Sequence, residues 1–216
     1  HFFFKINLLI SCVIFSVGLI LFFKNINLNF LKYLDKKIII YPIILLFLLP
    51  MLVSQKYHED FGYYHLPYAL AFLENKIVFG FANIDKSYVY NSIWLNLNSI
   101  FFLNNNNFNF LTLPSFILFI FFIFFSINKL LEKKEVKSSD YYLLVTLFYF
   151  ILKFTRISEF GVDLPAIIFS ILSIYYFIKF FEVDKISEKK IIFYYNLAFS
   201  IFSVLIKFST GPIIFL

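Results

Sequence analysis

Six long runs of apolar residues constrain what this chain can fold into. They lie at residues 6–23, 38–53, 110–127, 141–154, 164–181 and 191–206, and a seventh begins at Pro212. A helix needs about 20 apolar residues to cross a bilayer, and several runs approach that length. The alternating ten-residue pattern of a transmembrane barrel is missing. The sequence therefore predicts an all-α, polytopic transmembrane helix bundle.

The composition agrees with a membrane protein. Charged residues make up 15% of the chain, whereas soluble domains carry about 25%. Cys12 is the only cysteine, which excludes an internal disulfide or a zinc site built from cysteines. Because the chain begins at His1 and ends inside an apolar run, we expect residues 1–216 to form the N-terminal part of a single transmembrane domain in a longer protein.

The lysines predict how the runs are oriented. Each of the loops 24–37, 128–140 and 179–190 carries four lysines, and alternating spans would place all three on one side. By the positive-inside rule that side is the cytoplasm. The net charge of +6 is explained by this sorting and requires no nucleic-acid partner. The opposite, outer face receives residues 54–109, 155–163 and 207–211.

The outer loop 54–109 is long enough to hold structure of its own. We predict two short helices there, at residues 67–75 and 92–103, the second with Ser92 as its N-cap. In the second helix, apolar and polar residues recur on opposite faces: Ile93, Leu97 and Ile100 against Asn96, Asn98 and Ser99. That pattern predicts a helix in the membrane interface, with Trp94 as its anchor. A re-entrant segment or a further span is the alternative.

Four ionisable residues cluster where the second apolar run ends: His58, Glu59, Asp60 and His65. Ionisable groups at a membrane boundary are often functional. Asp60 and Glu59 could act as a general base or share a divalent cation; alternatively they are solvated loop acids. His58 and His65 could carry protons or donate to phosphate, although their spacing is not a zinc signature. Either histidine could instead be a polar residue of the interface.

Other outer segments contribute further candidates for binding. Arg156 is the only arginine, and its planar fork suits bidentate binding of phosphate, unless it is there by chance. Glu159 and Asp163 lie in the same loop, where Asp163 could instead cap the helix that follows. Lys207 could meet an anionic head group or extend to water. We expect Asp60, Arg156, Asp163 and Lys207 to converge on one outer-face cavity, with the two short helices in its wall.

Three short motifs carry a resemblance to a known class. Residues 60–67 (DFGYYHLP), 91–94 (NSIW) and 159–165 (EFGVDLP) resemble segments of bacterial multispanning proteins that are placed near the GT-C class of membrane glycosyltransferases. The resemblance covers most of the chain from residue 54 onward. One departure is that the acidic loop follows the second apolar run here, whereas in the class it usually follows the first helix.

The resemblance implies a GT-C-like fold and a multi-pass location in the bacterial cytoplasmic membrane. It also implies an active site on the periplasmic or extracellular face and a polyprenyl-phosphate-linked sugar as donor. The acceptor would be a glycan, a lipid or a protein. The catalytic base of the class, an acid in the first outer loop, would be Asp60, with Glu59 beside it. The substrate-binding set would comprise His58, His65, Arg156, Glu159, Asp163 and Lys207.

The sequence also limits the alternatives. It has no phosphate-binding glycine loop, no dinucleotide fingerprint and no H-E-x-x-H zinc motif. Nucleotide hydrolysis and the zinc chemistry of H-E-x-x-H enzymes therefore lack support. No cofactor is indicated beyond the divalent cation that the acids could share. A transporter or lipid-glycan flippase would need polar residues along a path through the bilayer. A third alternative is a membrane scaffold that has no catalytic or binding site.

Overall fold

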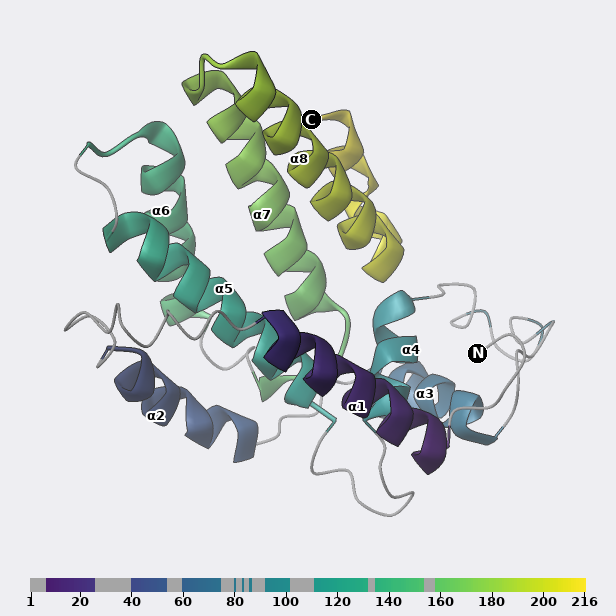
Figure 1. Cartoon of the computed structure of the whole chain (residues 1–216). Coiled ribbons are helices and arrows are strands. Elements are labelled where there is room, and N and C mark those ends of the chain that lie inside the picture. Colours follow the sequence, from purple (N-terminus) through teal and green to yellow (C-terminus); the bar gives the residue numbers. More distant parts are fainter. Residues whose placement is uncertain are drawn as a thin grey trace.

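The computed structural model describes residues 7–25, 40–53, 60–74, 80, 83, 86, 92–101, 111–131, 135–153 and 158–216, and this part of the chain is all-helical. Its elements, labelled in Figure 1 where space allows, are α1 (Leu8–Asn25), α2 (Ile40–Val53), the π-helical turn η3 (Phe61–His65), α3 (Leu66–Glu74), α4 (Ile93–Ile100), α5 (Leu113–Leu131), α6 (Ser138–Leu152), α7 (Asp163–Glu182), α8 (Ile186–Ile206) and the 3-10 helix η8 (Phe208–Phe215). In Figure 1, α7 and α8 form an antiparallel hairpin, while α1 and α2 cross the lower half of the view.

Three of the described helices are long and apolar enough to cross a membrane: α5, α7 and α8. The apolar parts of α1, α2 and α6 are shorter, as expected for runs that fall below the length of a perpendicular span. The described part of the chain therefore has the helices of a membrane protein, which confirms the coarse prediction of an all-α fold with apolar spans.

The helix boundaries match the predicted runs best at α7, within one residue at each end. The largest error is at α8, which begins at Ile186 and not at residue 191. An amphipathic first turn extends this helix beyond its apolar run, with an ion pair of 3.2 Å between Lys185 Nζ and Glu188 Oε1. At the other end, Lys207 is followed by the 3-10 helix η8, which contains Pro212, where a seventh apolar run is predicted to begin.

Side-chain bonds show which helix ends lie together. The backbone nitrogen and hydroxyl of Ser139 donate to the Glu182 carboxylate at 2.6 and 2.7 Å, which ties the start of α6 to the end of α7. At the opposite end of α7, Lys207 Nζ lies 2.5 Å from Asp163 Oδ1. The described loop residues 135–137 and 183–185 thus share one end, away from Asp163, as the alternating topology predicts.

Two clusters of buried residues form the core. One lies among α5, α6 and α7, where Phe119 and Phe122 each pack edge-on against Phe150 with ring centroids 5.1 and 5.4 Å apart. The other joins α3 and α4 to residues 160–166 and includes Ala69 and Phe160. The second cluster anchors the short helices of the outer loop against the start of α7.

The two predicted short helices exist, and α4 packs against its neighbours through Trp94 and through polar residues. Ser92 is its N-cap and accepts from the Trp94 backbone nitrogen. Trp94 is buried, and its indole nitrogen donates to Ser115 Oγ at 3.1 Å. Ser99 is also buried, and its hydroxyl reaches the Ala69 carbonyl at 3.0 Å. The prediction of Trp94 as an exposed anchor is therefore wrong, because its indole is packed inside the protein against α5.

A ladder of small polar residues joins α7 to α8. Ser173 Oγ donates to Asn196 Oδ1 at 2.5 Å and lies 2.7 Å from Ser200 Oγ. Closer to the Asp163 end, Ser203 Oγ lies 2.7 Å from Ser170 Oγ. Between apolar helices in a bilayer, such hydrogen bonds stabilise association, because lipid provides no hydrophobic driving force. This ladder fixes the register of the hairpin that carries Asp163 and Lys207.

We predict that Ser173→Ala lowers the free energy of unfolding in detergent micelles by about 0.6–1.7 kcal/mol, the range of interhelical hydrogen bonds in membranes. The loss arises because Asn196 and Ser200 then lack their partner on α7. Ser187→Ala is the matched control, since Ser187 is exposed at the start of α8, and it should leave the midpoint of unfolding unchanged. Equal stability of the two variants would contradict the structural role of the ladder.

Candidate functional site

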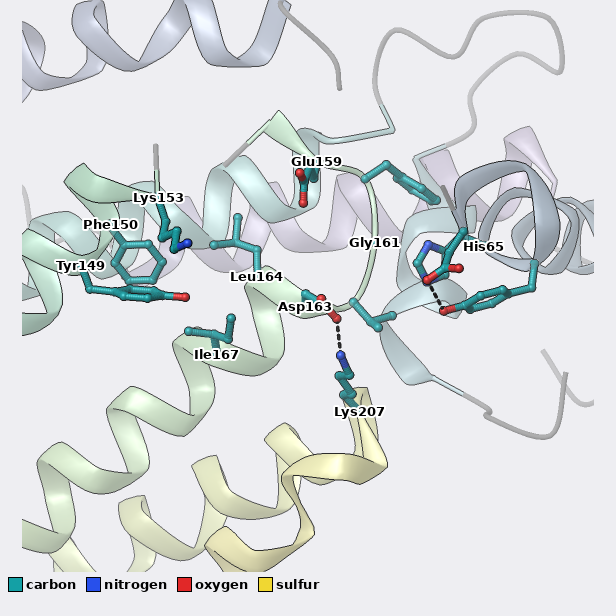
Figure 2. Close-up of a pocket in the computed structure, with 14 residues that line it drawn as sticks. His65, Tyr149, Phe150, Lys153, Glu159, Gly161, Asp163, Leu164, Ile167 and Lys207 are labelled. Atoms are coloured by element: carbon teal, nitrogen blue, oxygen red, sulfur yellow. Dashed lines mark hydrogen bonds and ion pairs between the residues drawn. The ribbon is translucent and has the colours of Figure 1, made fainter. Parts of the chain in front are cut away.

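One cavity of about 100 Å³ lies at the Asp163 end of the helices and collects side chains from separate segments. Five of the predicted site residues line it: Asp60, His65, Glu159, Asp163 and Lys207. Figure 2 shows Tyr149 and Phe150 of α6, and Lys153 directly after it, on one side of Asp163, and His65 on the other. The predicted convergence on one cavity is confirmed for Asp60, Asp163 and Lys207. The fourth residue of that prediction, Arg156, lies outside the described residues, as do His58 and Glu59.

The turn η3 explains how Asp60 and His65 reach the same cavity. In an α-helix of 3.6 residues per turn, a side chain five positions later points about 140° away around the axis. In a π-helix the hydrogen bonds join residues five apart, and here the Leu66 backbone nitrogen donates to the Phe61 carbonyl. The wider turn brings residues 60 and 65 towards one face. Such π-turns are frequent at functional sites.

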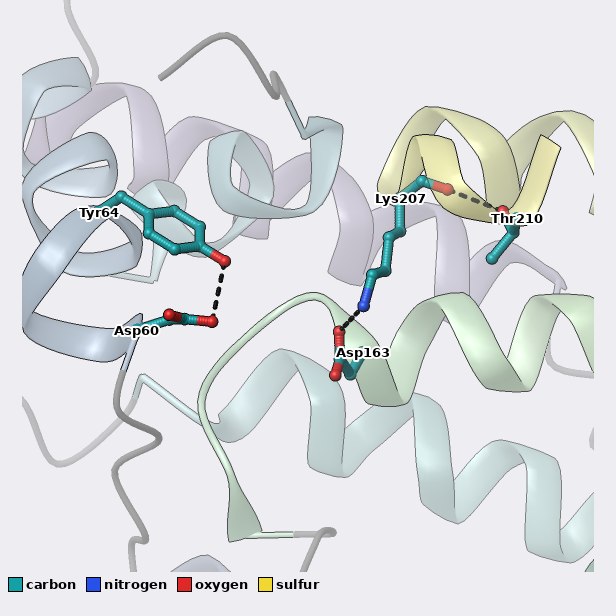
Figure 3. A network of polar contacts seen from close by, with 5 residues as sticks. All are labelled: Asp60, Tyr64, Asp163, Lys207 and Thr210. Atoms are coloured by element: carbon teal, nitrogen blue, oxygen red, sulfur yellow. Dashed lines mark hydrogen bonds and ion pairs between the residues drawn. The ribbon is translucent and has the colours of Figure 1, made fainter. Parts of the chain in front are cut away.

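Tyr64 belongs to the same turn and contacts Asp60 directly. Its hydroxyl donates to Asp60 Oδ2 at 3.1 Å, as Figure 3 shows. Burial, the charge of Asp60, the hydrogen bond to Asp60 and the charge of Asp163 together raise the pKa of Tyr64 to about 12, with burial as the largest cause. At neutral pH the phenol is therefore protonated and acts as a donor.

Asp163 and Lys207 form the ion pair at the centre of the cavity. Asp163 is the first residue of α7, whose N-cap is Val162 with no side-chain cap bond, so the alternative in which Asp163 is the N-cap of this helix is wrong. Its carboxylate is held by Lys207 instead, and it still gains from the positive end of the helix dipole. The two side chains are 43% and 40% exposed, so their attraction is weakened by solvent. A pair of this kind can exchange partners with a charged ligand.

The ring of His65 is buried, at 5% exposure, and it packs against a glycine. A Cβ added to Gly161 would lie 3.2 Å from His65 Cε1 and 3.5 Å from Nδ1. The Tyr64 ring packs edge-on to His65, with centroids 4.3 Å apart. The absence of a side chain at residue 161 thus allows the imidazole to pack directly against the backbone that leads into α7.

A second, larger cavity adjoins the first. Its volume is about 300 Å³, and it shares Tyr64, His65, Val162 and Lys207 with the smaller cavity. Its remaining walls come from the start of α4, the end of α8 and the start of η8: Ser92, Leu95, Ile206, Phe208 and Ser209. The shared residues form a boundary between a charged compartment and a mainly apolar one. Lys207 is the charged residue common to both.

The acidic residues do not assemble as a metal site in the described segments. Within those segments, no three His, Cys, Asp or Glu side chains group closely enough to hold a metal ion. Asp163 is paired with Lys207, and Tyr64 donates to Asp60. These two carboxylates of the cavity are thus engaged with a protein donor and a protein cation, and the same groups are suited to proton transfer or to binding of a charged group.

Besides apolar residues, the cavity is lined by four residues that are not among the predicted site residues: Tyr64, Tyr149, Lys153 and Gly161. Lys153 directly follows the last residue of α6, so the predicted topology already places it at the outer end. Tyr64 lies four residues after Asp60, a spacing that places two side chains on one helix face. The residue spacing was available as a signal for Tyr64, whereas the contact of Gly161 with His65 depends on the fold.

The fold and site define a multispanning helical membrane protein with a charged cavity at one end of its helices. The chain belongs to the family described as domain of unknown function (DUF8201), whose model matches residues 1–216. No curated protein and no solved structure matches the chain. The family description carries no activity, so a functional proposal must rest on the residues of the site.

We predict that Gly161→Ala lowers the free energy of unfolding by about 1–3 kcal/mol, the usual cost of forcing an extra methyl group into a packed site. The new Cβ would push against the His65 ring. Gly62→Ala is the matched control, because a Cβ at Gly62 meets nothing within 4 Å. Thermal unfolding of both variants tests this, and equal midpoints would contradict a close contact between residue 161 and His65.

Proposed function

We propose that this protein is a membrane glycosyltransferase of GT-C type, which moves a sugar from a polyprenyl-phosphate donor to an acceptor at the outer face of the cytoplasmic membrane. The observation that carries the proposal is one cavity lined by Asp60, His65, Asp163 and Lys207, which come from three separate segments of the chain. Acid, imidazole and ammonium groups in one place supply both a base for a hydroxyl group and cations for a phosphate.

The proposed step is a single displacement. The oxygen of the acceptor hydroxyl forms a bond to the anomeric carbon, and Asp60 receives the hydroxyl proton. The bond between the anomeric carbon and the phosphate oxygen breaks, and its electron pair leaves on the lipid phosphate. Lys207 and Lys153, which both line the cavity, would stabilise the negative charge that builds there. The step needs no oxidant, nucleotide or metal.

The larger cavity suits the lipid end of such a donor. Leu95, Val162, Ile206 and Phe208 give it an apolar wall, and Lys207 lies at the boundary with the charged compartment. Ligand pockets commonly combine an apolar lining with a few placed polar groups. A lipid phosphate would then lie with its first apolar units in the larger cavity and its anionic group on Lys207, replacing Asp163 as the partner of that lysine.

The proposal predicts that Asp60→Asn abolishes the transfer. In the full-length protein, we expect the rate of sugar transfer from synthetic short-chain polyprenyl-phosphate hexoses to fall by about 10²–10⁴-fold, the usual contribution of a general base. The assay uses washed membranes with equal amounts of each variant. Asp184→Asn is the matched control, since Asp184 is exposed between α7 and α8. Unchanged transfer in Asp60→Asn would remove Asp60 from the mechanism.

The role of Lys207 is tested by binding and not by turnover. We expect Lys207→Met to weaken binding of farnesyl phosphate by about 10-fold or more, because a hydrogen bond to a charged group contributes about 1.5–3 kcal/mol. Binding of farnesol, which lacks the phosphate, should change little. Lys185→Met, at the opposite end of the hairpin, serves as the control. If farnesyl phosphate bound equally well to both variants, Lys207 would not be the phosphate ligand.

A further inference from the structure

Tyr64 is a side chain of the site to which the proposed reaction gives no role, although it contacts the proposed base. Its hydroxyl donates to Asp60 Oδ2, its ring packs on His65, and it lines both cavities. The neighbouring Tyr63 is 75% exposed and lines neither cavity. Two adjacent tyrosines on one turn thus have different surroundings, and only Tyr64 faces the acid that the proposal uses as a base.

We propose that Tyr64 is a positioning residue, whose hydrogen bond holds the Asp60 carboxylate in the orientation that proton transfer requires. This inference rests on the proposed function. A carboxylate can rotate about its last side-chain bond, and that torsion has a broad preference. A donor held at 3.1 Å from Oδ2 restricts this rotation, and so fixes the direction in which the carboxylate faces the hydroxyl of the acceptor.

The surroundings of Tyr64 keep it in this role. The ring is held between Asp60 and His65 by the π-turn, so the hydroxyl is delivered by a fixed scaffold and not by a mobile loop side chain. The pKa of Tyr64 is raised to about 12 by burial and by the nearby acids, so the phenol keeps its proton throughout the neutral range. A positioned donor of this kind lowers the entropic cost of bringing the reacting carboxylate into the required orientation.

The experiment compares Tyr64→Phe with Tyr63→Phe in the full-length protein and has two readouts. The first is steady-state transfer from a short-chain polyprenyl-phosphate hexose, with kcat and KM separated, in the wild-type and Asp60→Asn backgrounds. The second needs no turnover: the rate at which a water-soluble carbodiimide labels Asp60, measured by mass spectrometry of peptides. Both substitutions keep the aromatic ring, and thermal midpoints check that the variants fold.

For Tyr64→Phe, we expect kcat to fall about 10-fold with KM within 2-fold, because a misoriented base slows the reaction and leaves donor binding intact. In the Asp60→Asn background, Tyr64→Phe should cause no further loss. Asp60 should be labelled about 5-fold faster, since its hydrogen bond no longer has to open before the carboxylate reacts. Tyr63→Phe should match the wild type in both readouts.

Two results would overturn the inference. An unchanged labelling rate in Tyr64→Phe would show that the hydrogen bond does not hold Asp60. Wild-type kcat in Tyr64→Phe, together with loss of transfer in Asp60→Asn, would remove the positioning role and leave the proposed function standing. Unchanged transfer in Asp60→Asn would instead overturn the proposed function and, with it, the inference. Failure of the inference alone is thus distinguishable from failure of the proposed function.

Discussion

The packing of α7 against α8 is the interaction on which the site depends. Lipid offers these helices no hydrophobic reason to associate, so small residues and interhelical hydrogen bonds must supply it. Ser173 is bonded to Asn196 across the pair, and Ser203 lies 3.1 Å from the Ala166 carbonyl. Ser203 Oγ also donates to Thr210 at 2.9 Å, and the Thr210 hydroxyl donates to the Lys207 carbonyl at 2.8 Å. The ladder therefore extends to the backbone of the lysine that faces Asp163.

The charges of the site are balanced in a way that suits exchange of partners. Asp60, Glu159 and Asp163 share the cavity with Lys153 and Lys207, so neither sign dominates strongly. The ion pair between Asp163 and Lys207 is half exposed, and a pair of this kind contributes about 0–1 kcal/mol to stability. Such a pair costs little to open, which fits a lysine that would transfer from a protein carboxylate to a ligand phosphate better than it fits a structural clamp.

The sequence predicts the coarse architecture because its strongest signals are long-range ones. The apolar runs locate the helices, and alternation of lysine-rich loops places residues 163 and 207 at one end, as the structure has them. Local side-chain contacts are harder to predict from the sequence. The sequence predicts Trp94 as a membrane anchor, whereas in the structure its indole nitrogen donates to Ser115. The π-turn at residues 61–65 has no sequence signature, so the joint placement of Tyr64 and His65 could not be derived from spacing alone.

The ladder also bears on the choice between an enzyme and a conduit. Transport would require polar groups in the bilayer that are available to a moving solute. Ser170, Ser173, Asn196, Ser200 and Ser203 are bonded to one another between two close helices. Opening that contact would break the bonds that hold the hairpin together. The ionisable groups of the site, by contrast, lie around a cavity at one end of the helices. The five polar residues between α7 and α8 thus serve the packing of the hairpin, and this arrangement fits a site at one face better than a path between these two helices.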